Sequence, residues 1–534
     1  DILVDLPSQL GLDGQTDLAY KGFNRYAKRF WLDGDYDLSK VSQFNYRVTH
    51  NLETRDTEML SYIIKNIDVT YQKGNSPYLT AYVNSDNSEE TGAAEQRAKE
   101  VSIIGYIGKN VSGTLTIPET VYCDDGDPMT DDECTVVAIG NNAFANDMHG
   151  ETGIQKVIIP KTVEVIGSGA FYNNNSLTEI DIADGSALTE IGECAFSYIP
   201  NLTSFEIPAN VLTIGERAFI GSGITSFTTG QDSYFTWRDN LLVNENVTDV
   251  SNKIAIYADP TVSNITIPSD VKTLAPYLFY GYKNLQSVNL NQVKYIGYEA
   301  FAQSGVNTFT NAGNVEEADI SAVSGTPWLD SQSGDTVTLG KVLLQYKGEE
   351  TQVVIPEGVA RIGAGAFISE TIESVIFPTT MDIIGRNTFS GCQNLEWVLF
   401  TSSLPPILDG ECFEEDATLY VKQTSLPAYE GSIYFKNLKN PLQTKEVTVT
   451  FKDKNGATIG TTTETYYSTF DAYVTPPAVT GYDFICWLDE EGNEVYNNNI
   501  FSYFNDVTLT AHYEKSRYSI TFNDGDNSET LDVE

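Results

Sequence analysis

The segment Val163-Glu-Val-Ile-Gly-Ser-Gly-Ala-Phe171 carries the pattern from which the architecture of this chain follows. It reads as an apolar residue, two positions, Ile or Leu, usually Gly, two positions, then a small residue and Phe. Eight segments, this one included, match the pattern. Their anchor residues are Val136/Ile139/Ala143/Phe144, Val163/Ile166/Ala170/Phe171, Leu188/Ile191/Ala195/Phe196, Val211/Ile214/Ala218/Phe219, Val271/Leu274/Leu278/Phe279, Val293/Ile296/Ala300/Phe301, Val359/Ile362/Ala366/Phe367 and Met381/Ile384/Thr388/Phe389.

The spacing of these segments indicates a solenoid. Uninterrupted neighbours lie 22 to 27 residues apart, as from Leu274 to Ile296 and from Ile139 to Ile166. A period of about 20–30 residues is typical of units that bury their apolar faces only by stacking on one another. The pattern therefore predicts columns of Ile and Phe side chains running through a stack of coils.

A second apolar pattern precedes each segment and predicts a short strand. Val157 and Ile159, for example, are spaced by two, as a strand with one buried face requires. Pro160 follows and ends the strand because proline cannot donate to a β-ladder. Together the two patterns predict a mainly β fold with few short helices or turns.

The pattern also divides the chain. We predict an N-terminal module of unknown fold at residues 1–100, a solenoid with a C-terminal cap at 101–440, and a small β-rich domain at 446–515. Residues 516–534 repeat the start of that domain, so we expect a second, truncated copy. Two interruptions of the period, at 235–257 and 337–346, predict inserted hairpins.

Composition excludes several classes of function. The formal net charge of −42 would repel nucleic acid and anionic membrane surfaces. The three His residues lie in separate regions, and no zinc, nucleotide-binding or hydrolase motif is present. No apolar run reaches the roughly 18 residues of a membrane span, so no membrane insertion is expected in this segment. The start at Asp1 indicates a mature or truncated piece.

The repeat resembles the leucine-rich repeats of the BspA-like bacterial surface proteins. The resemblance covers about Val101–Leu438 and rests on Ile-Pro, Val-x-x-Ile-Gly-x-x-Ala-Phe and Asn-Leu-x-x-Ile recurring at fixed offsets. The segment Val447–Tyr513 is similar to the Listeria–Bacteroides repeat, a β-grasp-like stalk module. The usual Gly-Trp pair of that module is Cys486-Trp487 here.

Both resemblances imply a secreted or wall-attached bacterial protein, located outside the cell, that adheres to a host or microbial surface protein or glycan. The family has no shared catalytic residues, so the resemblance implies a protein that is not an enzyme and needs no cofactor. Two alternatives remain open: an ancillary binding region of a larger surface enzyme, and a structural spacer.

One cluster of apolar residues occupies positions that should face outward from the strands. Ile376, Trp397 and Leu399 stand out from a strip that is otherwise small and polar. Clustered apolar residues at exposed positions indicate an interaction patch, with Trp as a favoured anchor. The alternative is that the C-terminal cap, which is next in sequence, covers them.

Cys123 and Cys134 flank an acidic loop and predict a disulfide-linked hairpin, in keeping with an oxidising exterior. The loop carboxylates offer oxygen ligands for Ca²⁺, but their spacing matches no known calcium loop. Asp33-Gly-Asp-Tyr-Asp37 resembles an EF-hand only in its first ligands.

Overall fold

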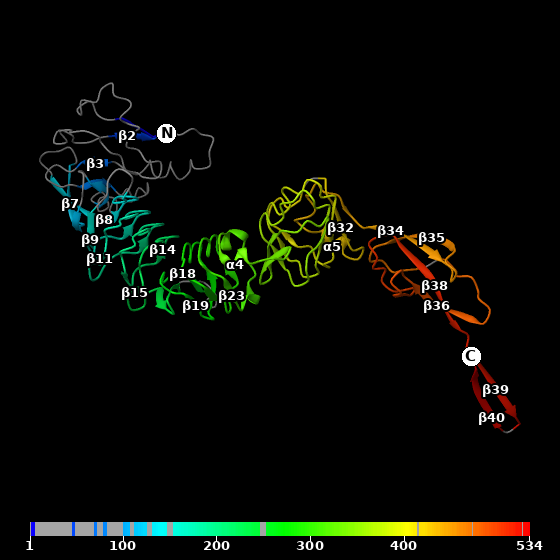
Figure 1. Ribbon diagram of the computed structural model, residues 1–534. Helices are drawn as coiled ribbons and strands as arrows, with labels where there is room; N and C mark the ends of the chain where they lie inside the picture. The colour runs from blue at the N-terminus through cyan, green and yellow to red at the C-terminus, as the bar shows by residue number, and fades with distance from the viewer. Residues whose placement is uncertain are drawn as a thin grey trace. The chain divides into compact units, whose positions relative to one another are not determined.

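The repeats fold into the stacked coils of a β-solenoid (Figure 1). The computed structural model describes residues 2–5, 45–48, 69–71, 78–82, 100–106, 112–124, 131–146, 153–245, 253–413, 416–471, 474–525 and 527–533. Its described helices are short: η3 (Ala312–Asn314), η4 (Ile320–Val323), α4 (Pro327–Asp330) and α5 (Leu426–Glu430). The predicted mainly β solenoid is confirmed. The chain forms two compact units, Asp1–Ser333 and Gly334–Glu534.

The longer strand of each coil in the first unit pairs in parallel with its neighbours. These strands are β6 (Ser112–Thr116), β9 (Gly153–Ile159) and β11 (Glu179–Ile182), then β13 (Ser204–Ile207) and β15 (Ser226–Thr229), then β19 (Asn264–Thr266), β21 (Ser287–Asn289) and β23 (Thr308–Thr310). In β13 the side chains of Phe205 and Ile207 are buried and those of Ser204 and Glu206 are exposed. This alternation is the single buried face that the spacing predicted.

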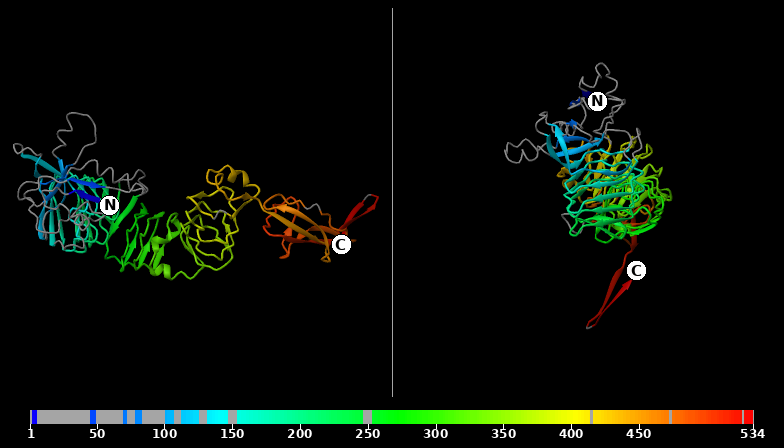
Figure 2. Two further views of the ribbon diagram at one scale, coloured as in Figure 1. Left: turned by 90° about the horizontal axis from the view of Figure 1, so that it is seen from above. Right: turned by 90° about the vertical axis from the view of Figure 1, so that its left-hand side faces the viewer.

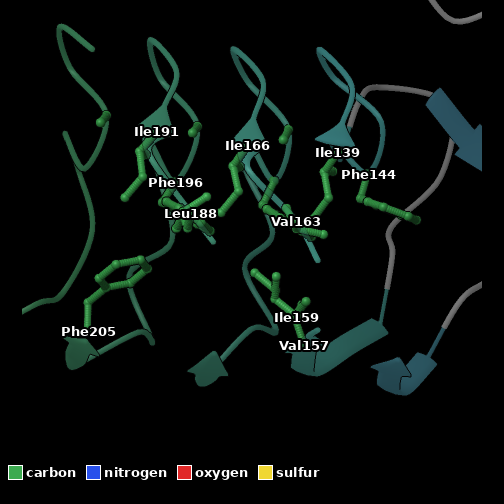
Figure 3. Packing of buried hydrophobic residues seen from close by; sticks show 14 of the residues in the cluster. Ile139, Phe144, Val157, Ile159, Val163, Ile166, Leu188, Ile191, Phe196 and Phe205 are labelled. Carbon is green, nitrogen blue, oxygen red and sulfur yellow. The ribbon is translucent and has the colours of Figure 1, made fainter. Parts of the chain in front are cut away.

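The Val-x-x-Ile segments form a second parallel ladder of shorter strands. They are β8 (Asp131–Ile139), β10 (Val165–Ile166), β12 (Glu190–Ile191) and β14 (Thr213–Ile214), followed after an interruption by β20 (Val271–Leu274) and β22 (Tyr295–Ile296). The register places Ile139, Ile166 and Ile191 opposite one another. Figure 3 shows these three side chains repeating at the same place in successive coils.

Strands from the predicted N-terminal module extend this ladder. β3 (Val69–Tyr71) pairs with β4 (Tyr78–Tyr82), β4 pairs with β5 (Glu100–Tyr106), and β5 runs parallel to β8. β7 (Thr120–Asp124) forms a hairpin with β8. Apart from the pair β1 (Ile2–Asp5) and β2 (Asn45–Val48), most of residues 1–99 lies outside the described part of the chain. β3 and β4 therefore continue the sheet of the solenoid.

Phenylalanine rings form the second column of the core. Phe144, Phe171, Phe196 and Phe219 stack nearly parallel, with centroid distances of 5.5, 5.4 and 5.8 Å. Of the 32 predicted anchor side chains, all except Ile214 are buried. The coil core is thus continuous from repeat to repeat, as stacking of incomplete units requires.

The first inserted segment forms the predicted hairpin and interrupts both ladders. β16 (Phe235–Arg238) and β17 (Leu241–Asn244) are antiparallel, and β18 (Lys253–Ala258) then runs parallel to β20. Among the described residues β14 and β15 make no strand pairing with this insert or with the coils after it. Side chains span the break instead. The Tyr257 ring lies 6.1 Å from that of Phe219 and takes the place of the missing Phe.

The second unit repeats the design. One ladder contains β24 (Thr336–Leu339), β25 (Val342–Tyr346), β27 (Arg361–Ile362), β29 (Ile383–Ile384) and β31 (Ile407–Leu408). The other contains β26 (Gln352–Val354), β28 (Ser374–Phe377), β30 (Trp397–Phe400), β32 (Thr418–Val421) and β33 (Leu442–Gln443). β24 and β25 form the second predicted hairpin. Tyr346 stacks on Phe367 at 5.3 Å and so again replaces a Phe.

Beyond the coils, the second unit contains a five-stranded mixed sheet. Its order is β35 (Thr458–Thr465), β34 (Glu446–Lys452), β38 (Val507–Lys515), β36 (Tyr482–Leu488) and β37 (Glu494–Val495). β39 (Tyr518–Asp524) and β40 (Asn527–Val533) form a separate hairpin. The predicted strands at 447–451 and 507–513 are confirmed, whereas a β-grasp-like fold stays a prediction. Figure 2 gives two further views.

Candidate functional site

The predicted patch of Ile376, Trp397 and Leu399 is largely covered. Leu399 is only 2% exposed, so the expectation that it faces solvent is wrong. Ile376 and Trp397 are half-buried. The register β28–β30 does bring Ile376 beside Leu399, as the sequence predicted.

Aromatic side chains account for the covering of Trp397. The Phe504 ring, from the loop before β38, lies 4.8 Å from the Trp397 ring, and Tyr420 of β32 meets Trp397 edge-on at 6.2 Å. Lys445 sits 5.5 Å above the Tyr420 ring. Tyr420 belongs to the predicted cap, but Phe504 comes from the C-terminal sheet. The cap alternative therefore describes part of the covering, and binding by this patch stays a proposal.

Of the two cysteines of the predicted disulfide, the structure describes the side chain of Cys134. Cys134 is buried and disulfide-bonded, while Cys194, Cys392, Cys412 and Cys486 carry thiols. The Cys123 side chain, residues 125–130 of the acidic loop and the segment 33–37 lie outside the described residues. In the described part, no three His, Cys, Asp or Glu side chains come together as metal ligands. Nor does any described helix have the length and apolarity to cross a membrane.

A row of partly exposed tyrosines runs along the corners of the coils in the first unit. We call it the tyrosine ridge, and it consists of Tyr172, Tyr198, Tyr277, Tyr280 and Tyr298. The rings of Tyr172 and Tyr198 meet edge to face at 5.5 Å. Tyr277 meets Tyr298 at 5.6 Å and Tyr280 at 5.8 Å, again edge to face. Clustered Tyr side chains on a surface are typical of binding sites because they are large, rigid and amphipathic.

Arg217 connects the two halves of the ridge. Its guanidinium lies 4.8 Å above the centre of the Tyr277 ring and forms an ion pair with Glu193. Burial by itself lowers the pKa of Arg217, but the hydrogen bond to Glu193 and the neighbouring groups of Cys194, Glu193 and Tyr277 together raise it. Burial, together with the neighbouring phenols of Tyr172 and Tyr280, raises the pKa of Tyr198. The ridge is therefore one electrostatically connected surface.

Carboxylates surround the second half of the ridge. The Tyr298 hydroxyl donates to Glu299, and this bond raises the pKa of Tyr298. Burial chiefly raises the pKa of Tyr277, and the negative charges of Glu299 and Glu216 add to the effect. Phenol hydroxyls and carboxyl groups thus lie side by side on this surface.

The interruption of the solenoid leaves a notch in the ridge. At regular corners the N–H of the core Phe donates to the next coil, as from Phe196 to the Ala218 carbonyl at 2.7 Å. Among the described residues the N–H of Phe219 donates to no main-chain partner in the following coil, which contains Tyr257. A narrow cavity lined by Phe219, Tyr257 and Tyr277 occupies this place. Arg217 reaches across it to Tyr277.

The sequence did not predict the ridge. Its members hold no common offset from the core Phe: Tyr172 follows Phe171 directly, whereas Tyr298 precedes Phe301 by three residues. The sequence does contain a weaker indication of the ridge than a regular spacing. Tyr side chains occur in four corners of the coils, where small or polar residues would allow the same turn.

A family model with the description "BspA type Leucine rich repeat region (6 copies)" matches residues 132–248, 239–327 and 338–447, which is more than half of the chain. A comparison with curated protein sequences finds no match.

Several solved structures are similar. The pneumococcal vaccine antigen PcpA is 14% identical over 70% of this chain and 98% of that chain, with a TM-score of 0.35. A leucine-rich cell surface protein from Faecalibacterium prausnitzii is 20% identical over 62% and 95%, with a TM-score of 0.26. A leucine-rich repeat protein from Bacteroides ovatus is 16% identical over 68% and 79%, with a TM-score of 0.29.

Proposed function

Because the chain belongs to the family of BspA-type leucine-rich repeat proteins, we propose that it is a non-enzymatic adhesin of the bacterial cell surface. Its solenoid would bind a host or microbial surface protein or a glycan outside the cell. Solenoids present long surfaces formed by many coils, and this geometry suits binding better than chemistry.

The tyrosine ridge is the observation that supports a binding role most directly. Tyr298 is 51% exposed and Tyr198 is 41% exposed, although each ring offers a large apolar face. A structural spacer needs no such row. Single exposed apolar residues are normal on a protein surface, whereas contiguous groups of them mark interaction sites. The charge of −42 further disfavours nucleic acid as the partner.

The predicted patch is a second, smaller candidate surface. Ile376 and the accessible part of Trp397 lie on the strand face of the second unit. We propose that they contribute to binding only where Phe504 leaves the indole uncovered.

We also propose that Cys134, which is disulfide-bonded, pairs with Cys123 on the neighbouring strand β7. The backbone register places Cys123 opposite Asp132 and two residues from the partner position of Cys134. Peptide mapping without reductant should show the two Cys-containing peptides linked. Separate peptides would contradict the pairing.

The test of function is a binding screen of the purified chain against immobilised extracellular-matrix proteins, mucins and glycans, with Ca²⁺ and with chelator. Two variants are run beside it, Tyr298→Ala on the ridge and Trp397→Ala on the patch. Saturable binding that is lost in one variant would support the adhesin and locate its surface. A folded chain that binds nothing in the panel would contradict the proposal and favour a structural spacer.

A further inference from the structure

One basic side chain of the chain itself, Arg217, already lies on the tyrosine ridge. Its two contacts show which groups hold a cation on this surface. The Arg217 guanidinium is placed over the face of Tyr277 and beside the carboxylate of Glu193. A cation over an aromatic face within about 6 Å is attracted by the ring quadrupole. The adjacent carboxylate adds a charge-assisted hydrogen bond. One ring and one carboxylate are thus the elements that hold a basic side chain on this surface.

The same two elements recur further along the ridge without a basic side chain. Tyr298 is the most exposed ring of the ridge, and Glu299 lies at its hydroxyl. Glu216 is exposed and near Tyr277. Among the residues that the structure describes, no Lys or Arg forms an ion pair with Glu216 or Glu299.

Ring orientation and charge together favour a cationic ligand. The planes of Tyr277 and Tyr298 are 71° apart, so that the two rings form a corner rather than a flat platform. Corners of perpendicular aromatic rings are suited to enclosing a cationic group. The carboxylates around them repel sulfated or sialylated glycans and attract basic polypeptides.

We propose that the tyrosine ridge binds a basic, arginine- or lysine-bearing segment of a partner protein. A cationic side chain of the partner would lie in this corner against the Tyr298 ring and beside Glu299, next to the Arg217 that already covers the Tyr277 ring. This inference rests on the proposed binding function and specifies the chemistry of the partner.

The test uses fluorescence anisotropy of the full chain with a labelled nine-residue peptide of alternating arginine and glycine. A glutamine–glycine peptide of equal length is the neutral control. Measurements at about 0.15 M salt screen diffuse attraction beyond about 8 Å. Tyr298→Ala should weaken arginine-peptide binding about threefold, the effect expected for one exposed cation–π contact. Tyr298→Phe keeps the ring and should bind like the wild type.

Two charge variants separate a site from a general acidic field. Glu299→Gln should weaken binding about threefold, the effect of one lost charge-assisted contact at a partly exposed site. Glu206→Gln makes the same charge change on the strand face of β13 and should leave binding unchanged. Circular dichroism and melting temperature confirm that each variant is folded.

Equal losses in Glu299→Gln and Glu206→Gln, or full binding by Tyr298→Ala, would overturn the inference. A chain that binds immobilised proteins or glycans but not the arginine peptide would also overturn it, while leaving the proposed function intact. A chain that binds neither would refute both.

Discussion

Replacement of Phe196 by alanine should open the first unit locally and leave the second unit unchanged. The Phe196 ring is fully buried and lies between Phe171 and Phe219, at 5.4 and 5.8 Å. It also contacts Phe205 at 5.0 Å. Removing it takes one ring from the column and leaves a cavity enclosed by three others.

The expected cost is about 3–5 kcal/mol, because a fully buried Phe loses both its transfer free energy and its packing contacts. Each 1.4 kcal/mol is a factor of ten, so amide protection in the flanking coils should fall by about two to four powers of ten. Hydrogen exchange followed by mass spectrometry measures this directly. Nearest-neighbour coupling in a solenoid confines the change to coils near the substitution.

Phe389→Ala is the reciprocal control. Phe389 is equally buried in the second unit, between Phe367 at 4.8 Å and Phe413 at 5.6 Å. This variant should lower protection in the second unit only. The reasoning is refuted if Phe196→Ala changes both units equally, or if protection near residue 196 falls less than tenfold.

Three further predictions concern other parts of the chain. Hydrogen bonds, chiefly from Asn493, lower the pKa of Asp489 from 3.8 to about 2. The stability that they give is present above the ordinary pKa and is lost as the pH falls towards 2. The variant Asp489→Asn should therefore flatten the acid-unfolding profile between pH 4 and 2, measured by tryptophan fluorescence. Gly223→Ala should destabilise the first unit by about 2 kcal/mol or more in a denaturant titration, because its Cβ would come 2.1 Å from a carbonyl oxygen of the preceding coil. Phe504→Ala should expose Trp397, and acrylamide quenching of its fluorescence should increase.

Each of these predictions has an outcome that would contradict it. Gly313→Ala adds a Cβ where no atom lies within 4 Å, and it should cost little. Equal effects of the two glycine substitutions would contradict the close-approach argument. An Asp489→Asn profile that keeps the wild-type slope between pH 4 and 2 would contradict the argument from its hydrogen bonds. Unchanged quenching in Phe504→Ala would show that the Trp397 contact does not form in solution.

The sequence predicted the solenoid because its core obeys one spacing. Ile139, Ile166 and Ile191 each precede the core Phe of their own repeat by five residues, and hydrophobic burial acts on each of them in the same way. The exception is Ile214, which is only half-buried. It lies in the last coil before the insertion, where it lines the narrow cavity beside Phe219 and Tyr257.

What the sequence did not predict depends on contacts between distant residues. Leu399 occupies an outward strand position by spacing, yet it is buried. Tyr257 and Tyr346 complete the Phe columns although neither lies in the repeat motif. The tyrosine ridge likewise forms from residues at different offsets, so periodicity carries no signal for it.

The interruption at Tyr257 has a mechanical consequence. Between regular coils, tension along the chain would have to break rows of main-chain hydrogen bonds. Between the Phe219 coil and the insert, the described residues have no strand pairing, and the join is carried by aromatic packing and by the Tyr257 hydroxyl, which donates to the Ile224 carbonyl at 3.1 Å. When the first unit is stretched, the Phe219 coil and the insert should therefore separate at a lower force than any two regular coils.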